Sequence, residues 1–192
     1  MELDVPSILT TSRLDITPFG LGDLDDRLAY QSRDDVALYL YRAPLSREAC
    51  AAGIERAIAT TALTAEGDTM MFAIRLHGEH RVIGEVVLTL SSLSASQFEI
   101  GWVFNPEHSG KGYATEAARA IAGLAFSSYG AHRLFARLDA DNERSVLLCG
   151  RLGFRREAHL VENDRHPSGA WGSEFVYAAL EQDLVREDSS RR

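Results

Sequence analysis

The segment from Asn105 to Ala117, NPEHSGKGYATEA, constrains the fold more than any other part of this 192-residue chain. It follows a strand-like run, has glycines at positions 110 and 112 on either side of a lysine, and continues into strong helix formers. A helix N-terminus carries unpaired N–H groups and a partial positive charge, and glycine lets an anion approach the backbone closely. The segment therefore predicts a strand, a glycine loop and a helix that together bind a phosphate group.

Two common phosphate-binding motifs do not fit this segment. A P-loop needs Ser or Thr where the chain has Gly112, and glycine where it has Asn105. A dinucleotide-binding GxGxxG would need a third glycine at Thr115, and the preceding strands are joined by short turns and not by helices. Taken alone, the segment is also compatible with a glycine turn that only begins a helix.

Hydrophobic periodicity predicts one α/β domain with a mixed sheet. We expect strands at residues 12–19, 70–76, 81–90, 96–104, 132–140, 153–161 and 173–182, and helices beginning near Asp23, Ser46, Tyr113 and Asn142. Short turns join the three strands between residues 70 and 104, so these should form an antiparallel meander. The domain is expected to cover residues 1–192, with a core at about 11–183 and a frayed tail at 184–192.

Composition and charge exclude several classes of protein. The net charge of −8 argues against nucleic-acid binding and suits either a cationic substrate or simple solubility. No apolar run is long enough to span a membrane, and the first residues do not resemble a secretory signal. Cys50, Cys149 and six scattered histidines show no metal or disulfide pattern. We therefore expect a cytoplasmic protein without metal, nucleic acid or membrane partners.

Four segments, in this order, resemble the GNAT superfamily of acyl-CoA-dependent N-acetyltransferases: TSRLDITPF, EIGWVFNPEHSGKGYATEA, DADNERSVLLCGRLGF and WGSEFVYAAL. The first and last are similar to its RimJ/RimL branch, named for ribosomal-protein N-terminal acetyltransferases. The family loop usually reads Gln/Arg-x-x-Gly-x-Gly/Ala, so Gly112 and Ala114 match it and Ser109 departs from it. The resemblance implies a mostly antiparallel sheet of about six or seven strands, splayed in the middle, with about four helices.

The same resemblance implies where acetyl-CoA, the expected co-substrate, would bind. It places the molecule between the fourth and fifth predicted strands, with Asn142 against the pantetheine arm. It assigns oxyanion stabilisation to the backbone N–H of Val103 or Phe104. It places the pyrophosphate on the backbone amides of Ser109, Gly110, Lys111, Gly112, Tyr113 and Ala114.

Further residues are candidates for the general base and for the group that stabilises the departing thiolate. Alternation along the strand SQFEIGWVF puts Glu99 on the face opposite the aromatic residues, where it is a candidate general base or else a solvated carboxylate. Glu162 and Asp164 are alternative bases. The resemblance implies that Ser145 donates to the departing thiolate, whereas local bonding within a first helical turn is the alternative.

The predicted function is transfer of the acetyl group of acetyl-CoA to a primary amine, first of all the N-terminal α-amine of a protein. A small-molecule amine such as a polyamine, an amino acid or an antibiotic is the alternative, followed by a non-catalytic acyl-CoA sensor. The resemblance implies that the acceptor binds between residues of about 33–63 and 162–172. Trp102 and Trp171 either line that groove or simply pack. Both a monomer and a homodimer are compatible with the sequence.

Overall fold

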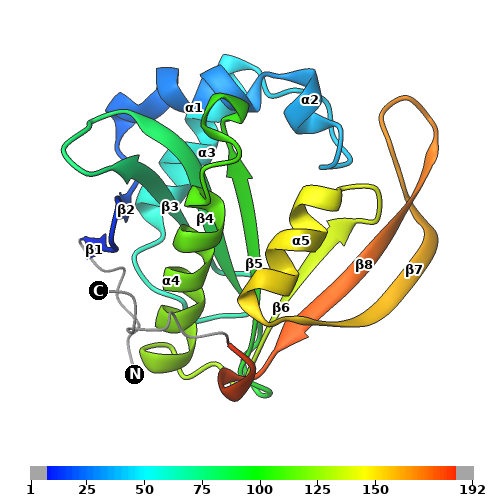
Figure 1. The fold of residues 1–192 in the computed structure, drawn as a ribbon. Helices are drawn as coiled ribbons and strands as arrows, with labels where there is room; N and C mark the ends of the chain where they lie inside the picture. Colours follow the sequence, from blue (N-terminus) through cyan, green and yellow to red (C-terminus); the bar gives the residue numbers. More distant parts are fainter. Residues whose placement is uncertain (1–7, 185–192) are drawn as a thin grey trace.

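The computed structural model describes residues 8–184, which form one eight-stranded sheet with five α-helices distributed over its two faces (Figure 1). The strands are β1 (Leu9–Thr10), β2 (Leu14–Pro18), β3 (Thr69–Leu76), β4 (Val82–Ser92), β5 (Gln97–Phe104), β6 (Arg133–Asp139), β7 (Arg155–Arg165) and β8 (Trp171–Ala179). The helices are α1 (Leu24–Gln31), α2 (Asp34–Ala37), α3 (Arg47–Ala59), α4 (Tyr113–Ser127) and α5 (Glu143–Leu152). No helix among residues 8–184 is long and apolar enough to cross a membrane.

The strand order is β1-β2-β3-β4-β5-β6-β8-β7, and neighbours are antiparallel except for β5 and β6, which are parallel. The predicted mixed, mostly antiparallel sheet and its meander are therefore confirmed. Among the strands and α-helices, two short elements were not predicted: β1 has two residues and α2 has four, so neither is long enough to show a hydrophobic period. The predicted tail lies outside the described residues except for Leu184, which packs on the core.

The sheet is splayed between β5 and β6. The two strands pair only over Gln97–Glu99 and Arg133–Phe135, after which β5 continues to Phe104 and β6 to Asp139 without pairing with each other. Figure 1 shows the two strands diverging toward the helix α2 side of the molecule. The facing edges of β5 and β6 beyond this point form a wedge with unpaired backbone groups.

Two apolar clusters cover the two faces of the sheet, and β5 contributes to both. Phe98 and Ile100 are buried in the larger cluster, which includes side chains from α4 and α5, and Trp102 packs against it. Val103 packs against the smaller cluster, which includes Tyr30 of α1 and Ile54 of α3. This confirms the predicted alternation along β5. Because burying each large apolar side chain contributes about 1.5–3 kcal/mol, a one-residue register slip here would be strongly unfavourable.

The predicted helix boundaries are confirmed at three positions. Ser46 Oγ accepts the N–H of Ala49 at 3.2 Å, and Asn142 Oδ1 accepts the N–H of Ser145 at 3.1 Å. Gly153 ends α5 in the left-handed conformation. Helix α3 is shorter than predicted: it ends at Ala59, and the backbone of Thr60 is extended. Thr60 and Thr61 are both β-branched, which disfavours continuation of the helix.

Candidate active site

The elbow between β5 and α4 is built around two glycines in the left-handed region. Gly110 has φ of 77° and Gly112 has φ of 83°, and α4 begins at the next residue. The N–H of Ser109 donates to the carbonyl of Pro106 at 3.0 Å, so this predicted member of the cradle already has a partner. Within the described residues, no intramolecular partner is found for the amides from Gly110 to Ala114. These amides can bind an anion at the N-terminus of α4.

The edge of β5 presents further backbone groups to the wedge. The N–H of Asn105 bonds to the carbonyl of Ile83 in β4, at 2.9 Å. Because backbone groups alternate in direction along a strand, the N–H of Val103 also points toward β4, and those of Trp102 and Phe104 point into the wedge. Of the two predicted oxyanion donors, Phe104 is therefore the one that faces the wedge.

This geometry fits an acyl-CoA molecule. The anion-binding elbow and the free edge of β5 are continuous along the chain, so a pyrophosphate at the first and an amide-bearing arm along the second would be held together. Asn142 caps α5 beside β6, on the other side of the wedge. No group of three or more potential metal ligands occurs within the described residues.

Ser145 meets β5 across the wedge. Its hydroxyl oxygen accepts a hydrogen bond from the indole Nε1 of Trp102 at 3.2 Å. Because the oxygen is the acceptor in this bond, the hydroxyl hydrogen stays available for another acceptor. From the sequence Trp102 was assigned to packing or to the acceptor groove, and no sequence signal pointed to Ser145 as its partner.

Glu99 lies on the opposite face and lines a cavity of about 280 Å³. The cavity is lined by Tyr39, Leu40, Tyr41, Glu99, Arg137, Leu138, Asp139, Asp164 and Glu174. Burial raises the pKa of Glu99, the positive charge of Arg137 opposes this effect, and Glu174 adds to it. A carboxylate with a raised pKa is a better proton acceptor, when ionised, than an exposed one. Of the alternative bases, Asp164 lines this cavity and Glu162 does not.

The cavity is acidic. Four carboxylates line it against one guanidinium, that of Arg137. Glu174 is paired with Arg137 and also accepts from the amide of Asn163, so it is held in a fixed position. Asp139 lies 3.5 Å from His166 and is only 3% exposed. The remaining negative charge favours a cation in the cavity.

Tyr41 joins the two predicted acceptor segments. It has φ of 50°, its ring stacks on His166 at 4.5 Å, and its hydroxyl donates to the carbonyl of Ser173 at 3.1 Å. A Cβ at Gly172 would lie 2.4 Å from the Tyr41 ring, so only glycine fits at that position. Burial, followed by the neighbouring carboxylate of Asp139, raises the pKa of Tyr41 and keeps its hydroxyl protonated.

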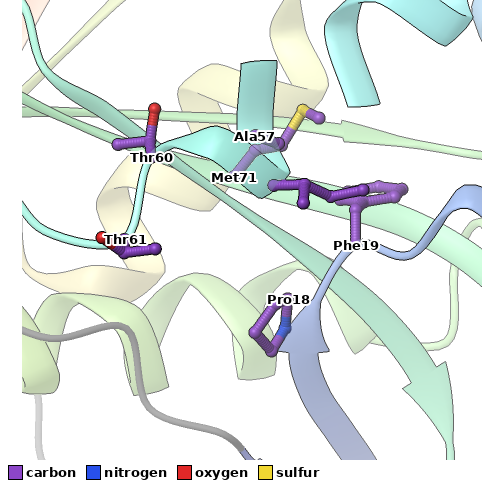
Figure 2. Close-up of a pocket in the computed structure, with 7 residues that line it drawn as sticks. Pro18, Phe19, Ala57, Thr60, Thr61 and Met71 are labelled. Carbon is purple, nitrogen blue, oxygen red and sulfur yellow. The ribbon is translucent and has the colours of Figure 1, made fainter. Parts of the chain in front are cut away.

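Another cavity, of about 390 Å³, lies between the end of β2, α3 and the start of β3 (Figure 2). Its lining residues are Pro18, Phe19, Ala57, Ile58, Thr60, Thr61 and Met71. None of them is titratable, so this cavity has no group for proton transfer.

Cys149, which does not line either cavity, is unreactive as a nucleophile, because complete burial raises its thiol pKa to about 12.

Comparisons with known proteins agree with this geometry. Residues 13–155 match the family described as acetyltransferase (GNAT) domain. The chain is 32% identical over 177 residues to the uncharacterized N-acetyltransferase YnaD of Bacillus subtilis, covering 91% of this chain and 98% of YnaD. It is 29% identical over 90 residues to spermidine N(1)-acetyltransferase of Escherichia coli K12, 47% of each chain. The crystal structure of a GNAT-family acetyltransferase from Bacillus anthracis superposes with a TM-score of 0.81 at 29% identity, covering 91% of this chain and 99% of that one.

Proposed function

Because the chain belongs to the GNAT family of acetyl-CoA-dependent acetyltransferases, we propose that it acetylates a small primary amine carrying a second positive charge. The observation that carries this proposal is the acidic cavity, in which four carboxylates face one guanidinium beside the point where β5 and β6 separate. Glu174 is paired with Arg137, and Glu99 would lie beside the nitrogen that reacts. The negative charges of Asp139 and Asp164 then remain to attract a second ammonium group. The likeness to spermidine N(1)-acetyltransferase supports a polyamine-type acceptor.

The N-terminal α-amine of a protein, predicted first from the sequence, is the second candidate. It is supported by the resemblance of residues 11–19 and 171–180 to the RimJ/RimL branch. Its pKa near 8 also lowers the demand on a general base, compared with about 10.4 for an alkylamine. The two candidates share the transfer chemistry and differ in what occupies the cavity beyond the reacting nitrogen.

The proposed chemistry assigns one task to each residue. Acetyl-CoA supplies an acyl group activated as a thioester. Glu99 accepts a proton from the acceptor nitrogen, directly or through water, as the new N–C bond forms and the C–S bond breaks. The N–H of Phe104 stabilises negative charge on the acyl oxygen. Ser145, whose oxygen is held by Trp102, donates a hydrogen bond to the departing thiolate.

The test is transfer of labelled acetyl from acetyl-CoA to three kinds of acceptor: linear diamines and triamines, a monoamine of equal length, and a size-fractionated cell lysate. We expect label in the small-molecule fraction and a preference of about tenfold or more for the diamine over the monoamine. Asp164→Asn should reduce that preference while retaining turnover of the monoamine. Label confined to a few protein bands would overturn the proposal in favour of the N-terminal amine. Binding of CoA without any transfer would support the sensor hypothesis.

A further inference from the structure

The segment Thr11–Arg13 donates hydrogen bonds to one carboxylate in the first turn of α4, that of Glu116. Glu116 is only 7% exposed, and its Oε1 accepts from Thr11 Oγ1 at 2.6 Å, Ser12 Oγ at 2.9 Å and the N–H of Arg13 at 2.9 Å. Its Oε2 accepts from Arg13 Nε at 2.7 Å and lies 2.6 Å from Arg13 Nη2. Three consecutive residues therefore hold a helix that begins about 100 residues later, immediately after the elbow.

Arg13 also contacts the elbow itself. Its Nη1 donates to the carbonyl of Lys111 at 2.9 Å, and its guanidinium carbon lies 4.8 Å from the centre of the Tyr113 ring. A Cβ placed on Gly112 would come within 3.4 Å of Arg13 Nη2. The guanidinium thus packs along one side of the loop, between the carboxylate of Glu116 and the peptide that joins Lys111 to Gly112.

The bond to Lys111 fixes the orientation of that peptide. In a trans peptide the C=O and the following N–H point in opposite directions, so a Lys111 carbonyl held by Arg13 turns the N–H of Gly112 away from the guanidinium. Glycines on both sides of Lys111 make the local backbone unusually free to rotate. Without the Arg13 bond, the peptide could flip and present a carbonyl oxygen where the N–H now points.

Arg13 also balances a charge beside the anion site. Burial alone would raise the pKa of Glu116, but hydrogen bonds from Thr11, Arg13 and Ser12 lower it overall, so the group is ionised at neutral pH. Its negative charge lies in the first turn of α4, where a phosphate would bind. Arg13 is the cation paired with it, and loss of that pair would leave a carboxylate that repels the incoming anion.

We propose that Arg13 is a positioning residue for the pyrophosphate of acetyl-CoA, acting through Glu116 and Lys111. It directs the amide of Gly112 toward the anion and neutralises the carboxylate beneath the cradle. This inference rests on the placement of the pyrophosphate at the elbow. It assigns a role to the segment TSR, which the transfer chemistry does not use.

Calorimetric binding of CoA and of pantetheine, which lacks the pyrophosphate, tests the proposal without relying on turnover. Arg13→Gln should raise the Kd for CoA about tenfold, which corresponds to the free energy of one charge-assisted hydrogen bond such as that from Arg13 to Lys111. The Kd for pantetheine should change by less than about twofold. Arg155→Gln is the matched control, because Arg155 is 50% exposed against 48% for Arg13 and also pairs with carboxylates, those of Glu157 and Asp183. An equal loss for both ligands, or no loss for CoA, would overturn the proposal.

A second pair of variants examines the charge. In Arg13→Gln/Glu116→Gln the repelling carboxylate is gone, so the Kd for CoA should recover by about threefold or more relative to Arg13→Gln alone. Failure to recover would refute the neutralising role of Arg13. Thermal unfolding of each variant shows that the comparison is made on folded protein.

A third comparison tests whether the elbow binds the pyrophosphate at all, independently of the role of Arg13. A Cβ at Gly110 meets no atom within 4 Å, and Asn and Asp tolerate its positive φ better than other residues do. Gly110→Asp should weaken CoA binding more than Gly110→Asn if the elbow holds the pyrophosphate. Equal affinities would overturn both the cradle and the inference. A loss for Gly110→Asp without a loss for Arg13→Gln would overturn the inference alone.

Discussion

Replacing the buried carboxylate of Glu85 should destabilise the protein more than any change to a surface ion pair. Glu85 lies in β4 and is 3% exposed, and Arg27 of α1 is 6% exposed. The carboxylate accepts from Arg27 Nε at 2.8 Å and Nη2 at 3.1 Å, from Tyr30 Oη at 2.8 Å and from Gln31 Nε2 at 2.8 Å. Each of its oxygens therefore serves two donors.

Glu85→Gln keeps the shape but removes the charge and one acceptor oxygen. The guanidinium of Arg27 would stay buried without its counter-ion, a situation that costs about 3–5 kcal/mol. For a chain of this size that corresponds to a fall in the unfolding midpoint of about 6–20 °C. Asp35→Asn, which breaks the exposed Arg33–Asp35 pair, is the reference and should move the midpoint by no more than about 4 °C.

Thermal and urea unfolding at pH 7 measure this difference, and a double variant sharpens it. Arg27→Met with Glu85→Leu removes both charges together, so it should be more stable than Glu85→Gln alone. A midpoint for Glu85→Gln within about 2 °C of the wild type would refute the reasoning, because the guanidinium would then be neutralised in some other way.

The same network should affect the cavity in which we propose that the amine binds. The side chain of Gln31 bonds to Arg42, and its carbonyl accepts the N–H of Leu45, so Gln31 anchors the loop that carries Tyr39 and Tyr41. Glu85→Gln should therefore raise KM for the amine more than KM for acetyl-CoA. Equal changes in the two KM values would indicate general loosening and not a local effect on the cavity.

Three further outcomes follow from the site and its charges. Glu99→Gln should lower kcat by about 10²-fold or more. In the wild type, kcat should rise with pH as Glu99 loses its proton, and the midpoint of that rise should lie above the ordinary pKa of 4.5. A pH profile of kcat for both proteins checks this. Ser145→Ala should slow turnover by about tenfold without abolishing it, because a thiolate is a tolerable leaving group, and steady-state kinetics with saturating amine measure it. Hydrogen bonding to a backbone carbonyl, and then to a neighbouring carboxylate, raises the pKa of His77. Its stabilising contribution is therefore present below pH 6.5 and is lost as the pH rises through the raised value. The unfolding midpoints of wild type and His77→Gln should differ below pH 6.5 and converge above the raised pKa.

Sequence patterns predicted the local features of the site and missed the contacts between distant segments. The alternation along β5 placed Glu99 on its correct face, and cap residues located the start of α5, because both depend on neighbours in the chain. The Trp102–Ser145 bond and the partners of Glu116 join segments 43 and more than 100 residues apart. Such contacts depend on strand register and on where the sheet separates, and no local period encodes either.

The elbow shows the same limit at a smaller scale. Its glycines predicted an anion site, but the pattern could not show that a 3-10 turn over Pro106–His108 uses the N–H of Ser109. A family position that usually holds Gln or Arg thus holds a residue whose amide is already bonded. The side chain of Ser109 is exposed, so its contribution to ligand binding would come from the hydroxyl alone.

The splay of the sheet places the residues that we propose for the two halves of the reaction on opposite faces. Trp102 and Ser145 approach the wedge from the face covered by α4 and α5, whereas Glu99 and the acidic cavity lie on the face covered by α1 and α3. The backbone edge of β5 lies between the two faces, and the N–H groups of Trp102 and Phe104 point from it into the wedge. Substitutions on the first face should therefore change the leaving-group step, those on the second should change amine selection and deprotonation, and a variant that alters both would have to move β5 itself.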